Sequence, residues 1–309
     1  MLAVDELTKR FTGAGGGLTA LERFSLHVPR GRFLAVIGPS GCGKSTLFNI
    51  VGGLLDGFEG RVLIDGQTLA GVHRDVGMVF QEESTFPWLT TLENVAFPLE
   101  IAGVPKPDRL RRARSLLRLV GLEGFEDRYP AELSGGMRQR TAIARTLAFE
   151  PKLLLMDEPF GALDPIIRAK AQDDLIAIQR RFKTTIVLVT HDMEEAIHLG
   201  DKIAVMDKGE LLQFAPPAEI ITRPATPFVG ELLGTGERAF RLLSLRRIAD
   251  IVEPGAAGGP PISADLTLRD ALDEALWTGR AAVPVIDTQG KPLGRVTLDA
   301  LTRESARPQ

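Results

Sequence analysis

Residues 1 to about 80 alternate short apolar runs with polar turns, which is the pattern of β-strands. The clearest runs are Leu26–Val28, Phe33–Ile37, Arg61–Ile64 and Val76–Phe80. Asp65-Gly66 stands between two apolar runs, and this dipeptide favours a tight β-hairpin. The N-terminal part of the chain is therefore predicted to be rich in strands.

Helical periodicity takes over in the middle of the chain, most clearly in Leu110–Val120 and Met137–Leu147. Two continuous apolar runs follow, Leu153–Met156 and Ile186–Val189, as expected for parallel strands buried on both faces. A helical pattern over residues 170–182 separates them. Strand, helix and strand in this order predict a right-handed crossover in a parallel sheet.

Proline-rich stretches interrupt the pattern in the last third of the chain. The sheet pattern stops near Ala215-Pro216-Pro217, and Glu253–Pro261 has the Pro and Gly content of a linker. We therefore expect a large domain over residues 1–235, a linker over 236–262 and a small domain over 263–309.

The small domain is predicted to mix helices with strands. A helix over Leu268–Trp277 is followed by a strand over Ala282–Ile286, the turn Asp287–Gly290, a short strand and a last helix. This order predicts a small α/β fold for the tail.

Composition narrows the class of protein. The chain has 309 residues, 44% of them hydrophobic and 25% charged, which is ordinary for a soluble globular protein. The net charge of −3 gives no general reason to expect nucleic acid as a partner. The basic run Arg109–Arg114 has a helical pattern and is interpreted as a solvated helix face.

The single cysteine, Cys42, excludes an intrachain disulfide, which fits a reducing cytoplasm. The N-terminus has no signal-peptide pattern, and no apolar run approaches the roughly 20 residues that span a bilayer. A role at a membrane would therefore be carried out from outside the lipid.

A glycine-rich segment follows the apolar run that ends at Ile37 and matches the phosphate-loop pattern G-x-x-x-x-G-K-[ST]. The segment consists of Gly38, Pro39, Ser40, Gly41, Cys42, Gly43, Lys44, Ser45 and Thr46. Its glycines allow backbone N–H groups to point inward at a phosphate, and the following helix adds its positive end. Lys44 would reach the β- and γ-phosphates and Ser45 would ligate Mg²⁺. The alternative is a glycine turn that matches by chance.

Asp157 and Glu158 end the apolar run that begins at Leu153. If this strand neighbours the strand before the phosphate loop, Asp157 lies beside Ser45 and can hold Mg²⁺. Glu158 is then placed to deprotonate an attacking water. The alternative role for the two carboxylates is to cap a helix.

Ser134-Gly135-Gly136 is a polar glycine turn at the start of an amphipathic helix, and so a second candidate anion site. Because the phosphate loop already accounts for one nucleotide, we expect this turn to contact the nucleotide of another subunit.

Together these motifs resemble the ATP-binding subunit of an ABC transporter over residues 1 to about 235. Ser134-Gly135-Gly136 resembles the signature motif of that family, Gln81 its Q-loop glutamine and His191 its switch histidine. Ala162-Leu163-Asp164 resembles the D-loop, and Phe11 stands where the family places an aromatic ring on adenine.

The resemblance implies an α/β fold. Its P-loop (RecA-like) parallel-sheet core carries an antiparallel β subdomain and an α-helical subdomain at about residues 85–150.

The resemblance also implies a head-to-tail dimer that holds ATP and Mg²⁺ between the Lys44 loop of one chain and the Ser134 turn of the other. In hydrolysis Glu158 would be the base, His191 would contact the γ-phosphate, and Gln81 would lie near Mg²⁺ and the water. Mg²⁺ would thus be held by Ser45, Gln81 and Asp157. Asp164 would communicate across the interface.

The family docks its membrane permease near the Q-loop, here the region Gln81–Thr90, on the cytoplasmic face of the bacterial inner membrane. Pro87–Thr90 resembles the nitrate, sulfonate and taurine importers. Residues 157–165 and 228–245 resemble the glycine betaine, choline and carnitine importers. Both branches import small polar solutes delivered by a periplasmic or extracellular solute-binding protein.

The tail from about Leu243 resembles one CBS module, with Val283–Asp287 and Gly294–Thr297 in its strand-turn-strand core. Ala300 stands where nucleotide-binding copies carry an acidic residue, which argues against adenosine-nucleotide binding. The hypothesis is that two chains pair their single modules, with either a regulatory or a purely dimerising role.

Two other classes of function remain as alternatives. A soluble ABC ATPase that acts on nucleic acid or ribosomes usually carries a coiled-coil insertion or two cassettes, and this sequence has one cassette and no heptad run. A protein that only senses ATP would not need Glu158 and His191.

Overall fold

The computed structural model describes residues 1–12, 17–81, 85–161, 163–234 and 236–306. These residues form two compact units. The first comprises residues 1–191 and 204–214, and the second comprises residues 192–203 and 215–309. This division does not coincide with the boundary expected at residue 235.

A six-stranded sheet forms the centre of the first unit, within the part of the chain that the structure describes. Its order is β10 (Glu210–Ala215), β9 (Lys202–Asp207), β3 (Phe33–Ile37), β8 (Thr185–Thr190), β7 (Leu153–Asp157) and β6 (Val76–Val79). The pairs β3·β8, β8·β7 and β7·β6 are parallel, which confirms the predicted parallel sheet.

The order of the strands corrects one expectation. The strand before the phosphate loop, β3, and the strand that carries Asp157, β7, are not neighbours, because β8 lies between them. Since β8 is parallel to both, the three strands still end at the same edge of the sheet.

A second sheet has the order β2 (Leu18–Val28), β1 (Leu2–Phe11), β4 (Glu59–Ile64) and β5 (Gln67–Thr68). The pairs β1·β2, β1·β4 and β4·β5 are antiparallel, as the β subdomain requires. Asp65 and Gly66 join β4 to β5 with φ values of 49° and 79°. Positive φ at both central residues is the type I′ geometry, so the predicted hairpin is confirmed.

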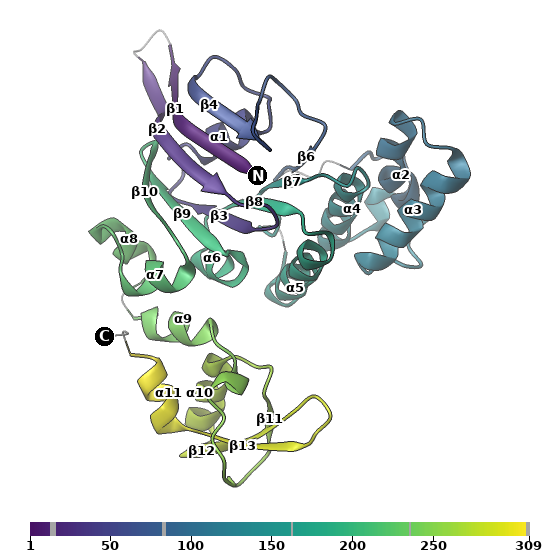
Figure 1. Cartoon of the computed structure of the whole chain (residues 1–309). Helices are drawn as coiled ribbons and strands as arrows, with labels where there is room; N and C mark the ends of the chain where they lie inside the picture. The colour runs from purple at the N-terminus through teal and green to yellow at the C-terminus, as the bar shows by residue number, and fades with distance from the viewer. Residues whose placement is uncertain (13–16, 82–84, 162, 235, 307–309) are drawn as a thin grey trace. The chain divides into compact units, whose positions relative to one another are not determined.

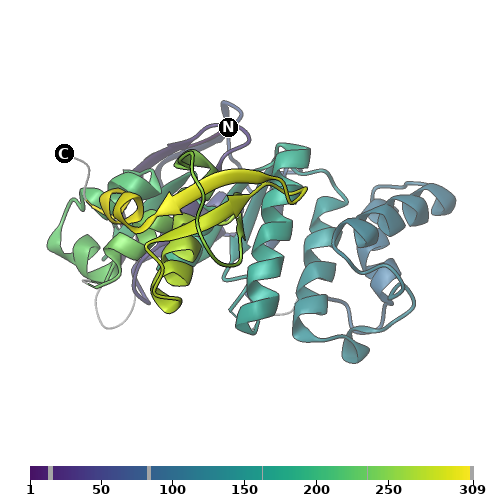
Figure 2. The same cartoon turned by 90° about the horizontal axis from the view of Figure 1, so that it is seen from below.

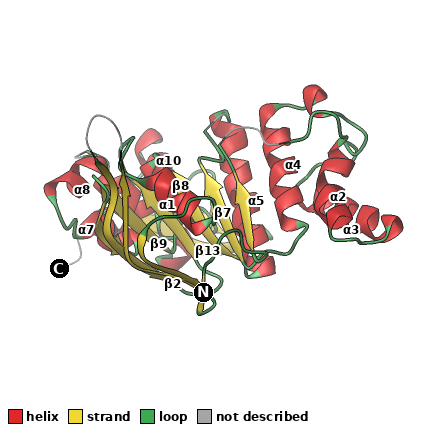
Figure 3. Cartoon of the chain, turned by 90° about the horizontal axis from the view of Figure 1, so that it is seen from above, coloured by secondary structure: helices red, strands yellow, loops and turns green. Residues whose placement is uncertain are grey.

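Helices complete the first unit: α1 (Lys44–Val51), α2 (Thr91–Ile101), α3 (Lys106–Leu119), α4 (Gly135–Leu147) and α5 (Pro165–Phe182). A short 3₁₀ helix, η1 (Pro130–Glu132), precedes α4. α2 packs against α3 and α4, and Figure 3 shows these three helices side by side. α4 also packs against β6 and so joins them to the sheet. They form the helical subdomain expected at residues 85–150.

The core of the first unit is continuous. Side chains of β1, β2, β3, β4 and α1 bury together with those of β7 and β8. Phe24, Leu34 and Ile50 are among the largest fully buried side chains. The two sheets are therefore held by one hydrophobic core, which fixes α1 and the loop before it.

The second unit is largely helical, with a three-stranded sheet near the C-terminus (Figures 1 and 2). Its helices are α6 (Met193–Leu199), α7 (Pro217–Thr222), α8 (Pro227–Leu232), α9 (Arg238–Ser244), η2 (Ile248–Asp250), α10 (Leu268–Trp277) and α11 (Leu298–Glu304). Its sheet has the order β11 (Ile262–Ser263), β12 (Ala282–Ile286) and β13 (Pro292–Thr297). β11·β12 is parallel and β12·β13 antiparallel, and α10 and α11 pack against this sheet.

The stretch expected to be a linker, residues 236–262, contains α9 and η2. Leu243 and Ile248 are fully buried in one cluster with Leu268 and Val283. The expectation of a linker was therefore wrong for its first half, because that half supplies core side chains to the C-terminal fold.

None of the described helices has the length and apolar content needed to cross a membrane.

Replacing Leu243 by Ala tests whether α9 belongs to this core. The substitution removes a fully buried side chain and should lower the free energy of unfolding by about 2–5 kcal/mol. Leu276→Ala, on α10 with 59% of the residue exposed, is the matched control and should cost less than about 1 kcal/mol. Urea unfolding measures both, and equal small losses would contradict the packing of α9.

Candidate active site

At two positions of the phosphate loop, other parts of the backbone come too close to leave room for any side chain. A Cβ on Gly38 would lie 2.3 Å from the Met206 carbonyl oxygen and 2.7 Å from Cys42 Sγ. A Cβ on Gly43 would lie 2.3 Å from the Ala20 carbonyl oxygen, and the φ of Gly43 is 105°. Neither position therefore accepts a larger residue without moving the loop.

Helix α1 presents its N-terminus to this loop. Its N-cap is Gly43, which has no side chain that could accept a hydrogen bond from the first turn. The N–H groups of that turn therefore remain available to an anion. Ser40, Gly41 and Ser45 are exposed around them.

Lys44 and Cys42 are buried within the loop. Lys44 Nζ donates to the carbonyl oxygens of Gly38 at 2.8 Å and Pro39 at 3.0 Å. The ammonium is thus held over the loop, where a phosphate would meet it. Burial raises the pKa of the Cys42 thiol, so Cys42 packs as a neutral side chain.

Asp157 ends β7 with its side chain about half buried. Burial raises the pKa of its carboxyl, the charge of Glu158 raises it further, and Lys44 opposes both. Lys44 of the phosphate loop thus acts electrostatically on Asp157, although β8 separates their strands.

The Ser45 hydroxyl and the Asp157 carboxylate are hard oxygen donors of the kind that Mg²⁺ prefers, so these residues fit the ion. Among the described residues, no three His, Cys, Asp or Glu side chains gather as a metal cluster. Phosphate oxygens and water are the other ligands that Mg²⁺ usually takes at a nucleotide site.

The three residues expected to be catalytic meet at the carboxylate of Glu158, which contacts both Gln81 and His191. Gln81 Nε2 donates to Glu158 Oε2 at 3.1 Å, and His191 Nδ1 lies 3.1 Å from Glu158 Oε1. The Glu158 side chain is 20% exposed and that of His191 is 67% exposed. A carboxylate in this position can accept a proton from a water that approaches from solvent.

The sheet explains why these residues meet. Gln81 follows β6, Glu158 follows β7 and His191 follows β8, and the three strands are parallel neighbours. Carboxyl ends of parallel strands lie along one edge of a sheet. Residues more than 100 positions apart in sequence, such as Gln81 and His191, are brought together in this way.

The remaining site residues lie on other elements. Ser134 is the N-cap of α4, and its hydroxyl accepts from Met137 N at 3.4 Å. Asp164 caps α5 by accepting from Ile167 N at 3.1 Å, while Ala162 lies outside the described residues. Phe11 ends β1, is 39% exposed and has Lys9 Nζ 5.0 Å from its ring centroid. Their roles toward a nucleotide stay predictions.

Sequence reasoning missed Asn94, which shapes the segment before α2. Asn94 is fully buried, accepts from Phe86 N at 2.8 Å and donates to the carbonyl oxygens of Phe86, Leu89 and Thr90. Arg145 of α4 lies 4.8 Å over the Phe86 ring. A lone Asn in a helical pattern gives no signal of such a role, whereas the Thr90–Glu93 capping box could have been found from its T-x-x-E spacing.

Known proteins resemble this chain over most of its length. Residues 21–161 match the family described as ABC transporter. The chain is 38% identical over 308 residues to the glycine betaine/carnitine/choline transport ATP-binding protein of Bacillus subtilis, covering 97% of this chain and 79% of that protein. It is 37% identical over 318 residues to a glycine betaine uptake system ATP-binding protein of Escherichia coli, covering 99% and 100% of the two chains. The chain belongs to the ATP-binding proteins of ABC transporters.

A solved structure of a related protein has a similar fold. It is a dimeric ATP-binding cassette in a post-hydrolysis state bound to ADP and Pi, 34% identical, with a TM-score of 0.63. The match covers 70% of this chain and 99% of the relative. The ABC protein is an ATPase that binds ATP with Mg²⁺ and releases ADP and phosphate.

Gly38→Ala tests whether the loop geometry sets nucleotide affinity. The new Cβ meets backbone at 2.3 Å, so the loop must shift and ATP binding should weaken roughly tenfold or more. Gly258→Ala is the control, because Gly258, like Gly38, has no positive φ, and a Cβ there would meet nothing within 4 Å. Isothermal titration with ATP measures both, and unchanged affinity of Gly38→Ala would refute the steric argument.

Proposed function

We propose that this ABC protein powers the import of a small quaternary amine, such as glycine betaine or choline, through a separate permease. The shared contacts of Glu158 with Gln81 and His191 carry the ATPase part of the proposal. Relatives that align over nearly the whole chain include two that bear glycine betaine or choline in their names, which supports the solute class. This favours the betaine branch over the nitrate, sulfonate and taurine branch that Pro87–Thr90 suggested.

Glu158 is the proposed general base. Gln81 and His191 hold its two carboxylate oxygens at 3.1 Å each, so the side chain is fixed where a water would be activated. Once nucleotide is bound, His191 would turn to the γ-phosphate and Gln81 toward Mg²⁺ and the water. Ser45 and Asp157 would hold Mg²⁺, which supplies charge stabilisation at the phosphates.

The active form is proposed to be a head-to-tail dimer, in which Ser134, Gly135 and Gly136 of a second chain contact the nucleotide. A Cβ on Gly136 would lie 3.0 Å from Ile167 Cγ2, so the turn packs closely on the start of α5. Ile166, in the same turn of α5, is 84% exposed. An apolar side chain so exposed beside Asp164 is what a surface covered by another subunit would carry.

The permease is proposed to dock at the region Gln81–Thr90, of which residues 82–84 lie outside the described residues. Trp88 is 69% exposed and its ring centroid lies 5.6 Å from that of Phe86. Asn94 hydrogen-bonds to the backbone of Phe86, and Arg145 packs over its ring. The exposed Trp88 therefore packs against a residue that is itself held in place. The protein would work as a peripheral subunit on the cytoplasmic face of the membrane, fed indirectly by a solute-binding protein.

The tail is proposed to be a CBS-like module. Its order β11, α10, β12, β13, α11 agrees with the strand-turn-strand core expected from the sequence. Asp287 Oδ1 accepts from the amides of Gln289 and Lys291, which fixes the turn between β12 and β13. Trp277, 88% exposed at the end of α10, is available for pairing with a second module.

Glu158→Gln tests the base. Gln keeps the side-chain shape and can still bond to Gln81 and His191, but it cannot take a proton. We expect kcat to fall by about 10²–10⁴-fold, with ATP still bound and the dimer accumulating in light scattering. Glu123→Gln, an exposed change on the helical subdomain, is the control. Undiminished hydrolysis would remove Glu158 as the base.

The solute is tested on the protein assembled with its permease and binding protein. ATPase activity should rise severalfold with glycine betaine or choline and stay at the basal level with taurine, sulfonates or nitrate. Stimulation by the second group alone would contradict the quaternary-amine proposal. The Glu158→Gln complex controls for contaminating ATPases.

A further inference from the structure

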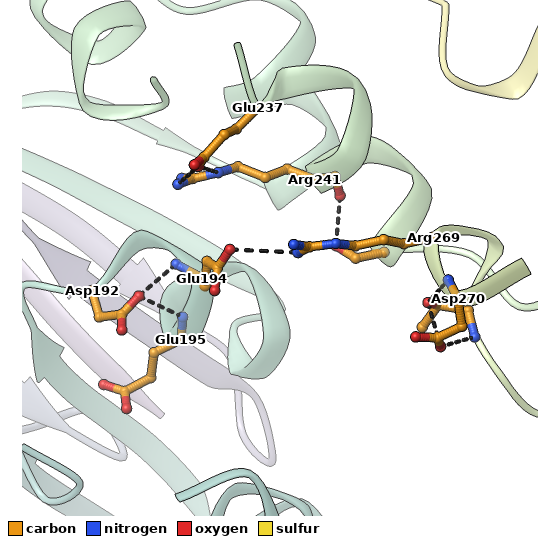
Figure 4. Close-up of polar contacts among 9 residues, drawn as sticks. Asp192, Glu194, Glu195, Glu237, Arg241, Arg269 and Asp270 are labelled. Carbon is orange, nitrogen blue, oxygen red and sulfur yellow. Dashed lines mark hydrogen bonds and ion pairs between the residues drawn. The ribbon is translucent and has the colours of Figure 1, made fainter. Parts of the chain in front are cut away.

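Helix α6 begins directly after the switch histidine. His191 is followed by Asp192, whose carboxylate accepts from Glu194 N at 2.8 Å and Glu195 N at 3.3 Å (Figure 4). This N-cap ties the first turn of α6 to the residue next to His191. A displacement of Glu194 is therefore passed to the backbone that carries His191.

A side chain of helix α10, in the tail, forms an ion pair with the first turn of α6. Arg269 Nη1 lies 3.4 Å from Glu194 Oε1 (Figure 4). Arg269 stands in the first turn of α10, which Thr267 and Asp270 close with a reciprocal capping box. The base of the Arg269 side chain is thus fixed by its own helix.

The ion pair lies at a pocket of about 540 Å³ whose lining, mainly from α6, α9 and α10, mixes charged side chains with Phe240 and Leu276. α9 packs against both α6 and α10. Its Arg241 pairs with Glu237, the N-cap of the same helix, at 2.5 Å. Arg269 is the side chain of α10 whose ion pair with Glu194 reaches the first turn of α6.

We infer that Arg269 and Glu194 are positioning residues for the switch histidine: through this pair the C-terminal module holds the first turn of α6 and so biases His191. The inference rests on the role proposed above for His191. It assigns the tail a direct effect on hydrolysis within its own chain, in addition to any pairing of tails between chains.

A double-mutant cycle on the full chain tests the pair. Arg269→Gln and Glu194→Gln should each lower kcat for Mg·ATP about two- to fivefold, which is the range that an exposed ion pair supplies. KM for ATP should be unchanged, because neither residue is among those proposed to contact the nucleotide. The double variant should be no slower than either single one, and the exchanged pair Glu194→Arg with Arg269→Glu should recover activity.

Two controls separate positioning from general damage. Arg303→Glu changes the charge of α11, on the same tail, without touching Glu194, and should leave kcat unchanged. In a His191→Ala background, measured by single turnover, the Arg269 and Glu194 variants should have no further effect.

Several results would overturn the inference: wild-type kcat in both single variants, additive losses in the double variant, a higher kcat on breaking the pair, or losses that persist without His191. Normal hydrolysis by His191→Ala alone would instead contradict the role proposed for His191, and the inference with it.

Discussion

Four strands, β6, β7, β8 and β3, run parallel and end at one edge of the six-stranded sheet, and the candidate chemistry depends on their register. Each strand delivers one piece to that edge: Gln81, Glu158, His191 and the phosphate loop. Side chains alternate between the two faces of a strand, so a slip of one residue in β7 would exchange the directions of Asp157 and Glu158. β3, β7 and β8 are almost wholly buried, so a slip would also draw polar residues at their ends into the core, which costs free energy.

Backbone strain adds a second constraint at the same edge. Glu158 has a φ of 43°, a conformation that costs a residue other than glycine roughly 1–3 kcal/mol. Glu158 N donates to the Val189 carbonyl oxygen at 2.9 Å, and its carboxylate is held from both sides by Gln81 and His191. These contacts offset the strain. The Glu158 carboxylate, proposed above as the base, is therefore held by residues that follow β8 and β6 and not by its own strand alone.

Much of this arrangement could be predicted from local patterns. Phe33–Ile37, Leu268–Trp277 and Ala282–Ile286 were predicted with the bounds that the structure has, because each is an apolar pattern closed by clear turn or cap residues. By contrast β1 was missed. Its alternation is broken by buried polar side chains, Thr8 and Lys9, and by irregular register with β2 and β4. The insertion of β8 between β3 and β7 was also missed, since pairing order is decided by contacts distant in sequence.

Distant burial also explains α9. Linker composition in residues 253–261 suggested that the whole of 236–262 lacked structure, yet Leu243 and Ile248 bury against Leu268 and Val283 farther along the chain. The sequence of a seven-residue helix does not predict this contact, because the residues that α9 packs against lie outside the helix. α9 shares its core with the tail and packs against α6, and the compact unit that contains the tail begins at Asp192, the residue after His191.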